Sequence, residues 1–209
     1  NAEANVRFAD CVGFITEGAH GFEEDGKPRL VNTPWSDKPL PFAEAAELGT
    51  DRVITEHSTI GILVTTDGSI SDIPREGYLK AEEKTVSRLK AMGKPFVIVL
   101  NCVEPDKPAA RKLKEELEGK YGVTVISTNS EKLDEGGLLN ILKAVLFEFP
   151  VSSFDVNIPE WMRFLPGDGS AVGELLERVK TAASSVNRMK DCSVFDGMLA
   201  DCKYWKANT

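Results

Sequence analysis

The sequence predicts an α/β protein in which helices cover both faces of a mostly parallel β-sheet. Three short runs, residues 60–65, 95–100 and 123–126, are rich in β-branched and other apolar residues. Strands that are apolar on both faces are typical of parallel sheets buried on both sides. Longer segments with apolar residues at helical spacing lie between these runs, and this alternation indicates an α/β fold. The 209 residues suffice for one such core and an appendage.

The chain before these strands is less regular. Residues 6–10 are a short apolar segment and are predicted to form a strand that runs into a loop. Residues 16–50 are rich in Gly, Pro, Asp and Asn, which predicts a long loop of functional interest. Within this stretch, residues 42–48 are predicted to form a short helix that Gly49 closes. Residues 52–57 are then expected to extend a helix toward the next strand.

Amphipathic helices are predicted to connect and close the sheet at residues 76–92, 108–121 and 138–149. Gly93 suits the C-cap of the first of these helices, because glycine readily adopts the left-handed conformation found there.

The pattern changes after Pro150. Residues 151–158 alternate between apolar and polar, which predicts an antiparallel or edge strand. Residues 166–169 predict a turn, and residues 172–189 predict an amphipathic helix. We therefore expect one domain over residues 1–150, followed by a helical and mixed C-terminal extension over residues 151–209 that begins a middle domain.

Composition restricts the class of protein. The net charge is −8, from 33 acidic and 25 basic residues, which argues against nucleic acid as a partner. No apolar run approaches the roughly 18 residues that a membrane span needs, and the first residues do not resemble a signal peptide. The four cysteines contain no CxxC pair. These features predict a cytoplasmic protein in a reducing environment.

Polar side chains follow the predicted strands, at Asp10, Thr66–Asp67, Asn101 and Ser127. Right-handed crossovers place the carboxyl ends of parallel strands at one edge of the sheet. Because ligands of open α/β sheets bind at that edge, these residues predict a ligand site. For Thr66–Asp67 we favour the simpler interpretation of turn residues.

Asp10 and Gly13 form a D-x-x-G motif. In P-loop enzymes, an aspartate at a strand end holds Mg²⁺, usually through water. The glycine lets its backbone amide approach the γ-phosphate, where a side chain would collide. The motif alone is weak, since Asp and Gly are common where a strand enters a turn.

The order of elements gives the motif its context: after Asp10, strands and helices alternate as in the second half of a GTPase-like, three-layer P-loop NTPase. GTPases carry Asn-Lys-x-Asp after the penultimate strand, and this chain has Asn101-Cys102-Val103-Glu104. Ser127 and Thr128 stand where GTPases carry a base-contacting loop. Candidate base-binding residues are thus Asn101, Glu104, Ser127 and Thr128, and ordinary strand-to-helix loops are the alternative.

Glu104 argues against guanine as the base. Its side chain is one methylene longer than the aspartate that accepts two N–H groups from guanine. Recognition of this kind depends on satisfied polar groups and tolerates such a shift poorly. The chain also contains no G-x-x-x-x-G-K-[ST] phosphate loop, so the front part of the domain is expected to lie outside it.

Several longer stretches of the sequence are distinctive. The most distinctive are Glu56-His57-Ser58-Thr59-Ile60-Gly61 and Ile73-Pro74-Arg75-Glu76, and the others are residues 6–14, 23–29, 31–35, 65–68, 93–96 and 148–151. In these stretches the chain resembles the stage IV sporulation protein A ATPases of the bacterial spore coat.

The resemblance implies an enzyme that binds ATP and Mg²⁺, with Asp10 as its Walker B aspartate. It implies that ATP hydrolysis drives self-assembly into a homopolymer, the basement layer of the spore coat. It further implies a place in the mother-cell cytosol, on the forespore outer surface. A small amphipathic membrane-anchoring peptide and other spore-coat proteins would bind regions mostly outside this chain.

Two other functions remain open. A regulatory GTPase of the same fold would need Glu104 to replace aspartate at the base. A purely structural assembly module would retain only a vestigial nucleotide site. In that case Trp161, Phe164 and Leu165 are interface candidates, although packing under the helix that begins near Val172 is the commoner outcome.

Overall fold

A computed structural model describes residues 5–24, 26–164 and 171–198 of the chain. The chain forms two compact units, Asn1–Val145 and Leu146–Thr209, and each is described by itself. In the described residues, no helix is both long enough and apolar enough to cross a membrane.

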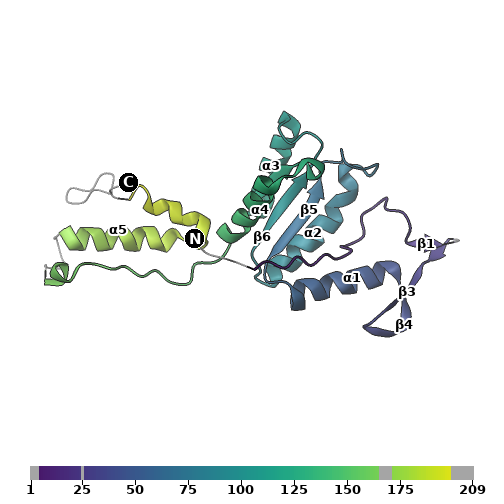
Figure 1. The fold of residues 1–209 in the computed structure, drawn as a ribbon, viewed down its shortest axis with the longest axis horizontal. Helices are drawn as coiled ribbons and strands as arrows, with labels where there is room; N and C mark the ends of the chain where they lie inside the picture. The colour runs from purple at the N-terminus through teal and green to yellow at the C-terminus, as the bar shows by residue number, and fades with distance from the viewer. Residues whose placement is uncertain (1–4, 25, 165–170, 199–209) are drawn as a thin grey trace. The chain divides into compact units, whose positions relative to one another are not determined.

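The first unit is built on a sheet of three parallel strands: β5 (Gly61–Thr66), β6 (Phe96–Asn101) and β7 (Val125–Thr128). Their order is β5-β6-β7, with β6 in the centre. Gly61 pairs with Phe96 and Ile98 with Val125. The predicted parallel sheet is confirmed, and all three carboxyl ends lie at one edge (Figure 1).

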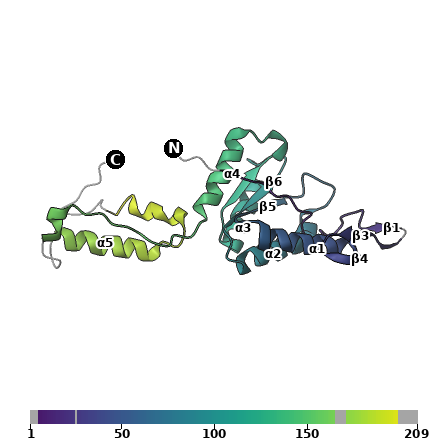
Figure 2. The same cartoon turned by 60° about the horizontal axis from the view of Figure 1, so that its bottom comes forward.

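Helices cover both faces of this sheet. They are α2 (Arg75–Ala91), α3 (Pro108–Tyr121) and α4 (Glu135–Phe147). The proline at its first position starts α3, and Gly122, with φ 67°, ends it. Figure 2 shows α4 on one side of the sheet and α2 and α3 on the other, with α1 beside them. The expected α/β architecture is therefore confirmed, and it is compatible with a P-loop NTPase-like fold.

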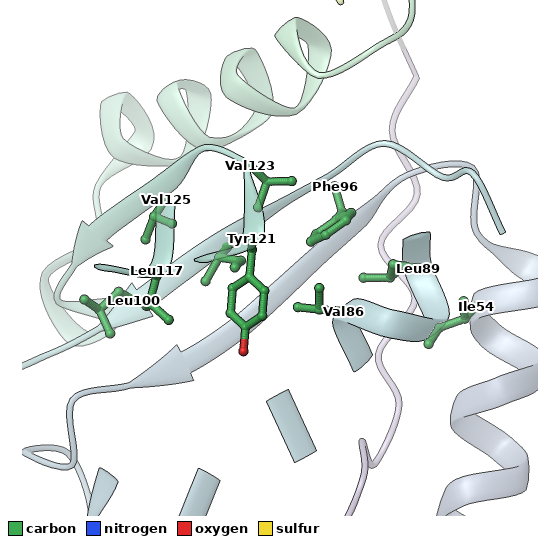
Figure 3. Packing of buried hydrophobic residues seen from close by; sticks show 10 residues of the cluster. Ile54, Val86, Leu89, Phe96, Leu100, Leu117, Tyr121, Val123 and Val125 are labelled. Carbon is green, nitrogen blue, oxygen red and sulfur yellow. The ribbon is translucent and has the colours of Figure 1, made fainter. Parts of the chain in front are cut away.

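The core follows from the alternation of side chains along β6. Phe96 and Leu100 point to one face, where they meet apolar side chains of α2 and α3 (Figure 3). Ile98 belongs to the same cluster. Val97 and Val99 also are buried, and alternation places them on the opposite face. The cluster on the first face comprises Ile54, Val86, Leu89, Phe96, Ile98, Leu100, Leu117, Tyr121, Val123 and Val125.

Helix α1 (Phe42–Arg52) continues into a short π-helix, η1 (Val53–His57). The prediction that Gly49 closes α1 is wrong, because the helix runs through this residue. Gly49 has a packing role instead. A Cβ atom there would lie 3.4 Å from two ring carbons of Trp35, so glycine provides room for the indole.

The long loop predicted over residues 16–50 is partly wrong. Four short strands pair antiparallel here: β1 (Glu23–Glu24) with β2 (Lys27–Pro28), and β3 (Leu30–Thr33) with β4 (Ser36–Pro41). Such short strands are stabilised by turns and by neighbouring segments, since an isolated hairpin is marginal in water. Their low apolar periodicity explains why the sequence pattern does not indicate them.

The strand predicted at residues 6–10 is also absent: these residues are irregular and exposed. A strand needs a neighbour whose backbone groups pair with its own. Among the described residues, no strand pairs with this segment. Apolar character alone therefore does not make it a strand.

The second unit contains α5 (Ala171–Ser185) and two 3₁₀ helices, η3 (Glu160–Phe164) and η4 (Met189–Phe195). The strand predicted at residues 151–158 is wrong. This segment is irregular, and the nearby pairing is a single bridge between Pro150 and Arg188. The helix predicted to reach residue 189 ends at Ser185. The turn predicted at residues 166–169 lies outside the described residues, as does Leu165.

Candidate functional site

Side chains and backbone groups join the loops that leave β6 and β7. The side-chain oxygen of Asn101 accepts the N–H of Ser130 at 2.9 Å. The N–H of Cys102 donates to the carbonyl of Thr128 at 2.9 Å. Parallel pairing brings these loops together, since Asn101 and Thr128 are partners in the register. The expected gathering of polar residues at the carboxyl edge of the sheet is present for β6 and β7.

The loop after β5 joins the same arrangement through Val103. Its N–H donates to Ser69 Oγ at 3.0 Å, and its carbonyl accepts from Asn129 Nδ2 at 3.0 Å. Asp67 in turn accepts both the N–H and the hydroxyl of Ser69. The interpretation of Thr66 and Asp67 as turn residues is confirmed, because Thr66 Oγ1 also accepts the N–H of Gly68 at 3.1 Å.

A pocket of about 640 Å³ lies beside this arrangement, within the range usual for small-molecule sites. Glu104 and Thr128 both line it. Glu104 forms an ion pair with Lys107, and the N–H of Lys107 donates to the Glu104 carbonyl at 3.2 Å. The Glu104 carboxylate is thus turned toward the loop to which Glu104 itself belongs. The full lining is Val103, Glu104, Pro105, Asp106, Lys107, Pro108, Thr128, Asn129 and Lys132.

Ser127 differs from its neighbours at the end of β7. Its Oγ is buried and has no hydrogen-bond partner among the described residues. A buried hydroxyl without a partner is costly, so it marks a position where a further group would be stabilising. Glu104 and Thr128 line one pocket at the ends of β6 and β7, and Asn101 helps to join the two loops. The structure does not bring Ser127 into the lining of this pocket.

Asp10 and Gly13 lie elsewhere. Both line a second pocket, of about 310 Å³, together with Ile60 and residues 61–64 of β5. Asp10 is exposed, and its Oδ1 accepts the N–H of Cys11 at 2.9 Å. Gly13 has φ 81°, a conformation that favours glycine. The structure does not bring these two residues together with the pocket at the ends of β6 and β7.

A buried polar network lies under the end of β5, and sequence reasoning missed it. Glu82 of α2 is at its centre, with 1% of its side chain exposed. Its carboxylate accepts the hydroxyls of Thr65 at 2.7 Å and Tyr121 at 2.9 Å, and it pairs with Arg75 at 2.7 Å. A signal was present, since Glu82, Val86 and Leu89 share one helical stripe.

Two groups of the first unit, the Tyr121 phenol and the Cys102 thiol, have raised pKa values. Burial raises the pKa of Tyr121, and donation of its phenol to Glu82 raises it further. Burial also raises the pKa of the Cys102 thiol, with added contributions from the charges of Asp67 and Asp106. A raised pKa keeps a thiol protonated and unreactive, which agrees with a core role for Cys102. In the part of the chain that is described, no group of three His, Cys, Asp or Glu residues forms a metal-binding cluster.

A three-stranded parallel sheet with helices on both faces, and with polar loops and a pocket at its carboxyl edge, is compatible with the class of P-loop NTPase-like domains. Comparison with protein families refines this: the model described as "Stage IV sporulation protein A, ATPase domain" matches residues 1–150. The chain belongs to the stage IV sporulation protein A family, and the resemblance noted in its sequence is confirmed.

Three curated relatives carry the name Stage IV sporulation protein A. The Bacillus anthracis protein is 43% identical over 189 residues, or 90% of this chain and 38% of the relative. The Bacillus subtilis protein is 40% identical over 202 residues, covering 97% and 41% respectively. The Clostridioides difficile protein is 41% identical over 186 residues, covering 89% and 38%. The chain thus spans about two fifths of the length of these relatives. No solved structure gives a significant match.

Proposed function

We propose that this protein binds and hydrolyses ATP, and that hydrolysis drives its self-assembly during sporulation. The observation that carries this proposal is the match of residues 1–150 to the ATPase domain of the family. The position of the larger pocket supports it, because open α/β sheets bind nucleotides at their carboxyl edge.

The residues of that pocket fit a nucleotide base. Thr128 and Asn129 supply polar groups, and Pro105 and Pro108 supply rigid apolar walls. Glu104 on the pocket wall favours adenine over guanine, because its side chain is one methylene longer than the aspartate that guanine recognition needs.

Asp10 supplies one carboxylate of the kind that binds a magnesium ion. Magnesium is usually held by one or two carboxylates together with phosphates and waters. Asp10 is an exposed carboxylate, and its Oδ1 accepts the N–H of Cys11. Among the described residues, no hydrogen bond or ion pair occupies its other oxygen. Asp10 would hold the ion, directly or through water, and Gly13 would present its amide to phosphate. When bound, Mg²⁺ neutralises phosphate charge.

The remaining parts of the proposal concern the whole protein. Its polymer forms the basement layer of the spore coat, in the mother-cell cytosol on the forespore surface. A small amphipathic membrane-anchoring peptide and other coat proteins bind it, through regions mostly outside this chain. Support comes from membership in the family.

One observation favours a second candidate, a structural assembly module with a vestigial nucleotide site. Asp10 and Gly13 line a different pocket from Glu104 and Thr128. In this candidate, Trp161 and Phe164 contribute to the assembly interface, and 62% and 84% of their surfaces are exposed.

The test measures phosphate release from ATP and from GTP by the full-length protein, with sedimentation of the same samples. We expect ATP-selective release and ATP-dependent pelleting, both lowered about ten- to hundredfold by Asp10→Ala. Asp72→Ala, which removes another exposed carboxylate, is the control and should change neither. Preference for GTP would identify a regulatory GTPase, and pelleting without any release would identify the structural module.

A further inference from the structure

The peptide groups of Val103 are held from both sides by side chains of other loops. Ser69, from the loop after β5, accepts its N–H at 3.0 Å. Asn129, from the end of β7, donates to its carbonyl at 3.0 Å. The segment between Asn101 and Glu104 is therefore fixed by the loops of both neighbouring strands, in addition to its own pairing with β7.

Each of the two side chains is itself anchored. Asp67 Oδ1 accepts the N–H of Ser69 at 2.9 Å and its hydroxyl at 2.5 Å. Because that hydroxyl donates to Asp67, its lone pairs remain free to accept from Val103. Asn129 is buried, with 7% of its surface exposed, and its Oδ1 accepts the N–H of Glu131 at 3.0 Å. This last bond caps the short 3₁₀ helix η2 (Ser130–Lys132).

The held segment forms one wall of the larger pocket. Val103 and Glu104 line that pocket directly, and Asn129 lines it from the opposite loop. Cys102, between Asn101 and Val103, is fully buried. A rotation of the Val103 peptide would thus move Glu104 and alter the shape of the pocket. A fixed wall lowers the cost of ordering the site when a ligand binds.

We propose that Ser69 and Asn129 are positioning residues that pre-form the wall of the base pocket and so contribute to nucleotide affinity and base selection. This inference rests on the proposed function, because it takes the pocket to be the place where the base binds. Both residues act through Val103 and need no contact with the phosphates. Their loss should therefore weaken binding of the base more than it slows hydrolysis.

The experiment compares variants of the full-length protein by steady-state hydrolysis of ATP and GTP and by thermal unfolding. Ser69→Ala removes the acceptor for Val103, whereas Ser69→Thr keeps a hydroxyl on an exposed residue. Asn129→Asp removes the donor but retains an oxygen for Glu131. Asn129→Ala separates loss of the donor from the added charge. Ser71→Ala is the matched control, because that nearby hydroxyl bonds Tyr78 and Ile73.

We expect Ser69→Ala, Asn129→Asp and Asn129→Ala to raise KM for ATP roughly three- to tenfold. We expect kcat to change less than about twofold and the preference for ATP over GTP to fall. Ser69→Thr should restore KM, and Ser71→Ala should leave it unchanged.

The proposal is overturned if the alanine and aspartate variants lower only the Tm, with KM and base preference as in wild type. It is also overturned if Ser71→Ala raises KM equally. Absence of ATP hydrolysis by the wild-type protein would instead remove the proposed function itself, and with it the role of these two residues. If the wild type hydrolyses ATP and the variants keep its KM and base preference, the proposed ATPase activity stands, but Ser69 and Asn129 do not contribute to it in this way.

Discussion

Glu82 shows how a single charged residue organises the first unit. Its carboxylate lies under the end of β5 and is engaged by a guanidinium and two hydroxyls. Arg75 also donates to the carbonyl of Thr66 at 3.3 Å, so the network holds the point where β5 enters its loop. Burying a carboxylate is costly unless it is paired and hydrogen-bonded. Each of these partners therefore has a measurable effect on stability.

Tyr121→Phe tests this network through pH. The pKa of Tyr121 is raised in the folded protein. The stabilisation that its protonated phenol gives is therefore complete below the ordinary tyrosine pKa of about 10. This stabilisation is lost as pH rises through the pKa of Tyr121 in the folded protein. At neutral pH we expect the substitution to lower the free energy of unfolding by about 1 kcal/mol, because Glu82 loses a donor.

Urea unfolding of both proteins between pH 7 and pH 11 measures the effect, and the difference between them should narrow above about pH 10. Tyr78→Phe is the control, since its phenol bonds Ser71 near the surface. If the difference in the free energy of unfolding stayed constant across this pH range, the Tyr121 phenol would not stabilise the fold by donating its proton to Glu82.

Helix α2 holds the segment that follows Gly13. The N–H of Glu17 donates to the Gly77 carbonyl at 2.9 Å, and Glu17 pairs with Lys80. Lys84 lies over the ring of Phe14, 4.7 Å from its centroid. A glycine inside a helix is unfavourable by about 1 kcal/mol relative to alanine. The close approach of the Glu17 backbone to Gly77 explains why a glycine stands at this position of α2. The position of residues 14–17 is thus coupled to α2.

Gly77→Ala should displace this segment. The new Cβ would lie 2.5 Å from the Glu17 carbonyl oxygen and 2.7 Å from Ile73 Cγ2. We expect a loss of about 1–3 kcal/mol in the free energy of unfolding and faster hydrogen exchange at the Glu17 amide.

Gly119→Ala in α3 is the matched control, because a Cβ there meets no atom within 4 Å. It should raise stability by up to about 1 kcal/mol through helix propensity. Equal effects of the two substitutions would mean that the segment is not docked on α2.

At the scale of the whole molecule, the second unit has a buried charge of its own. Glu148 has 1% of its side chain exposed and pairs with Arg188 and, at 2.8 Å, with Lys190. Backbone bonds reinforce this contact: Met189 N–H donates to the Phe149 carbonyl and Val151 N–H to the Asn187 carbonyl. The start of this unit is therefore joined to the segment that follows α5.

Glu148→Ala should weaken the contact between the start of the second unit and the segment that follows α5. We expect a loss of about 1–3 kcal/mol in the free energy of unfolding, below the usual range for a buried pair because both cations reach water. Hydrogen exchange should accelerate at Val151 and Met189 and stay unchanged in β6.

Glu177→Ala removes a carboxylate from an exposed pair with Lys180 in the same unit, and it should change stability by less than about 0.5 kcal/mol. Equal acceleration of exchange in β6 would show that the two units unfold as one.

Local patterns predicted the helices and parallel strands of the first unit from residue 60 onward, but not the short antiparallel strands β1–β4 before them. Helix α3 spans Pro108–Tyr121 as predicted, and β6 coincides with its apolar run to within one residue. Strand β7 begins two residues later than predicted. The strands predicted from apolar character at residues 6–10 and from alternation at residues 151–158 did not form. Such patterns indicate a strand only where another strand supplies hydrogen bonds.

For the candidate site, the sequence by itself determined which residue types stand at the strand ends, and through them the family. Crossover geometry then placed these strand ends at one edge of the sheet, and the observed register makes Asn101 and Thr128 partners. Only the tertiary structure decided that Ser69 and Asn129 hold Val103, that Lys107 engages Glu104, and that Asp10 lies in a different pocket. The physical reason is that local conformation depends on neighbours along the chain, whereas a hydrogen bond between loops depends on strands that the fold brings together.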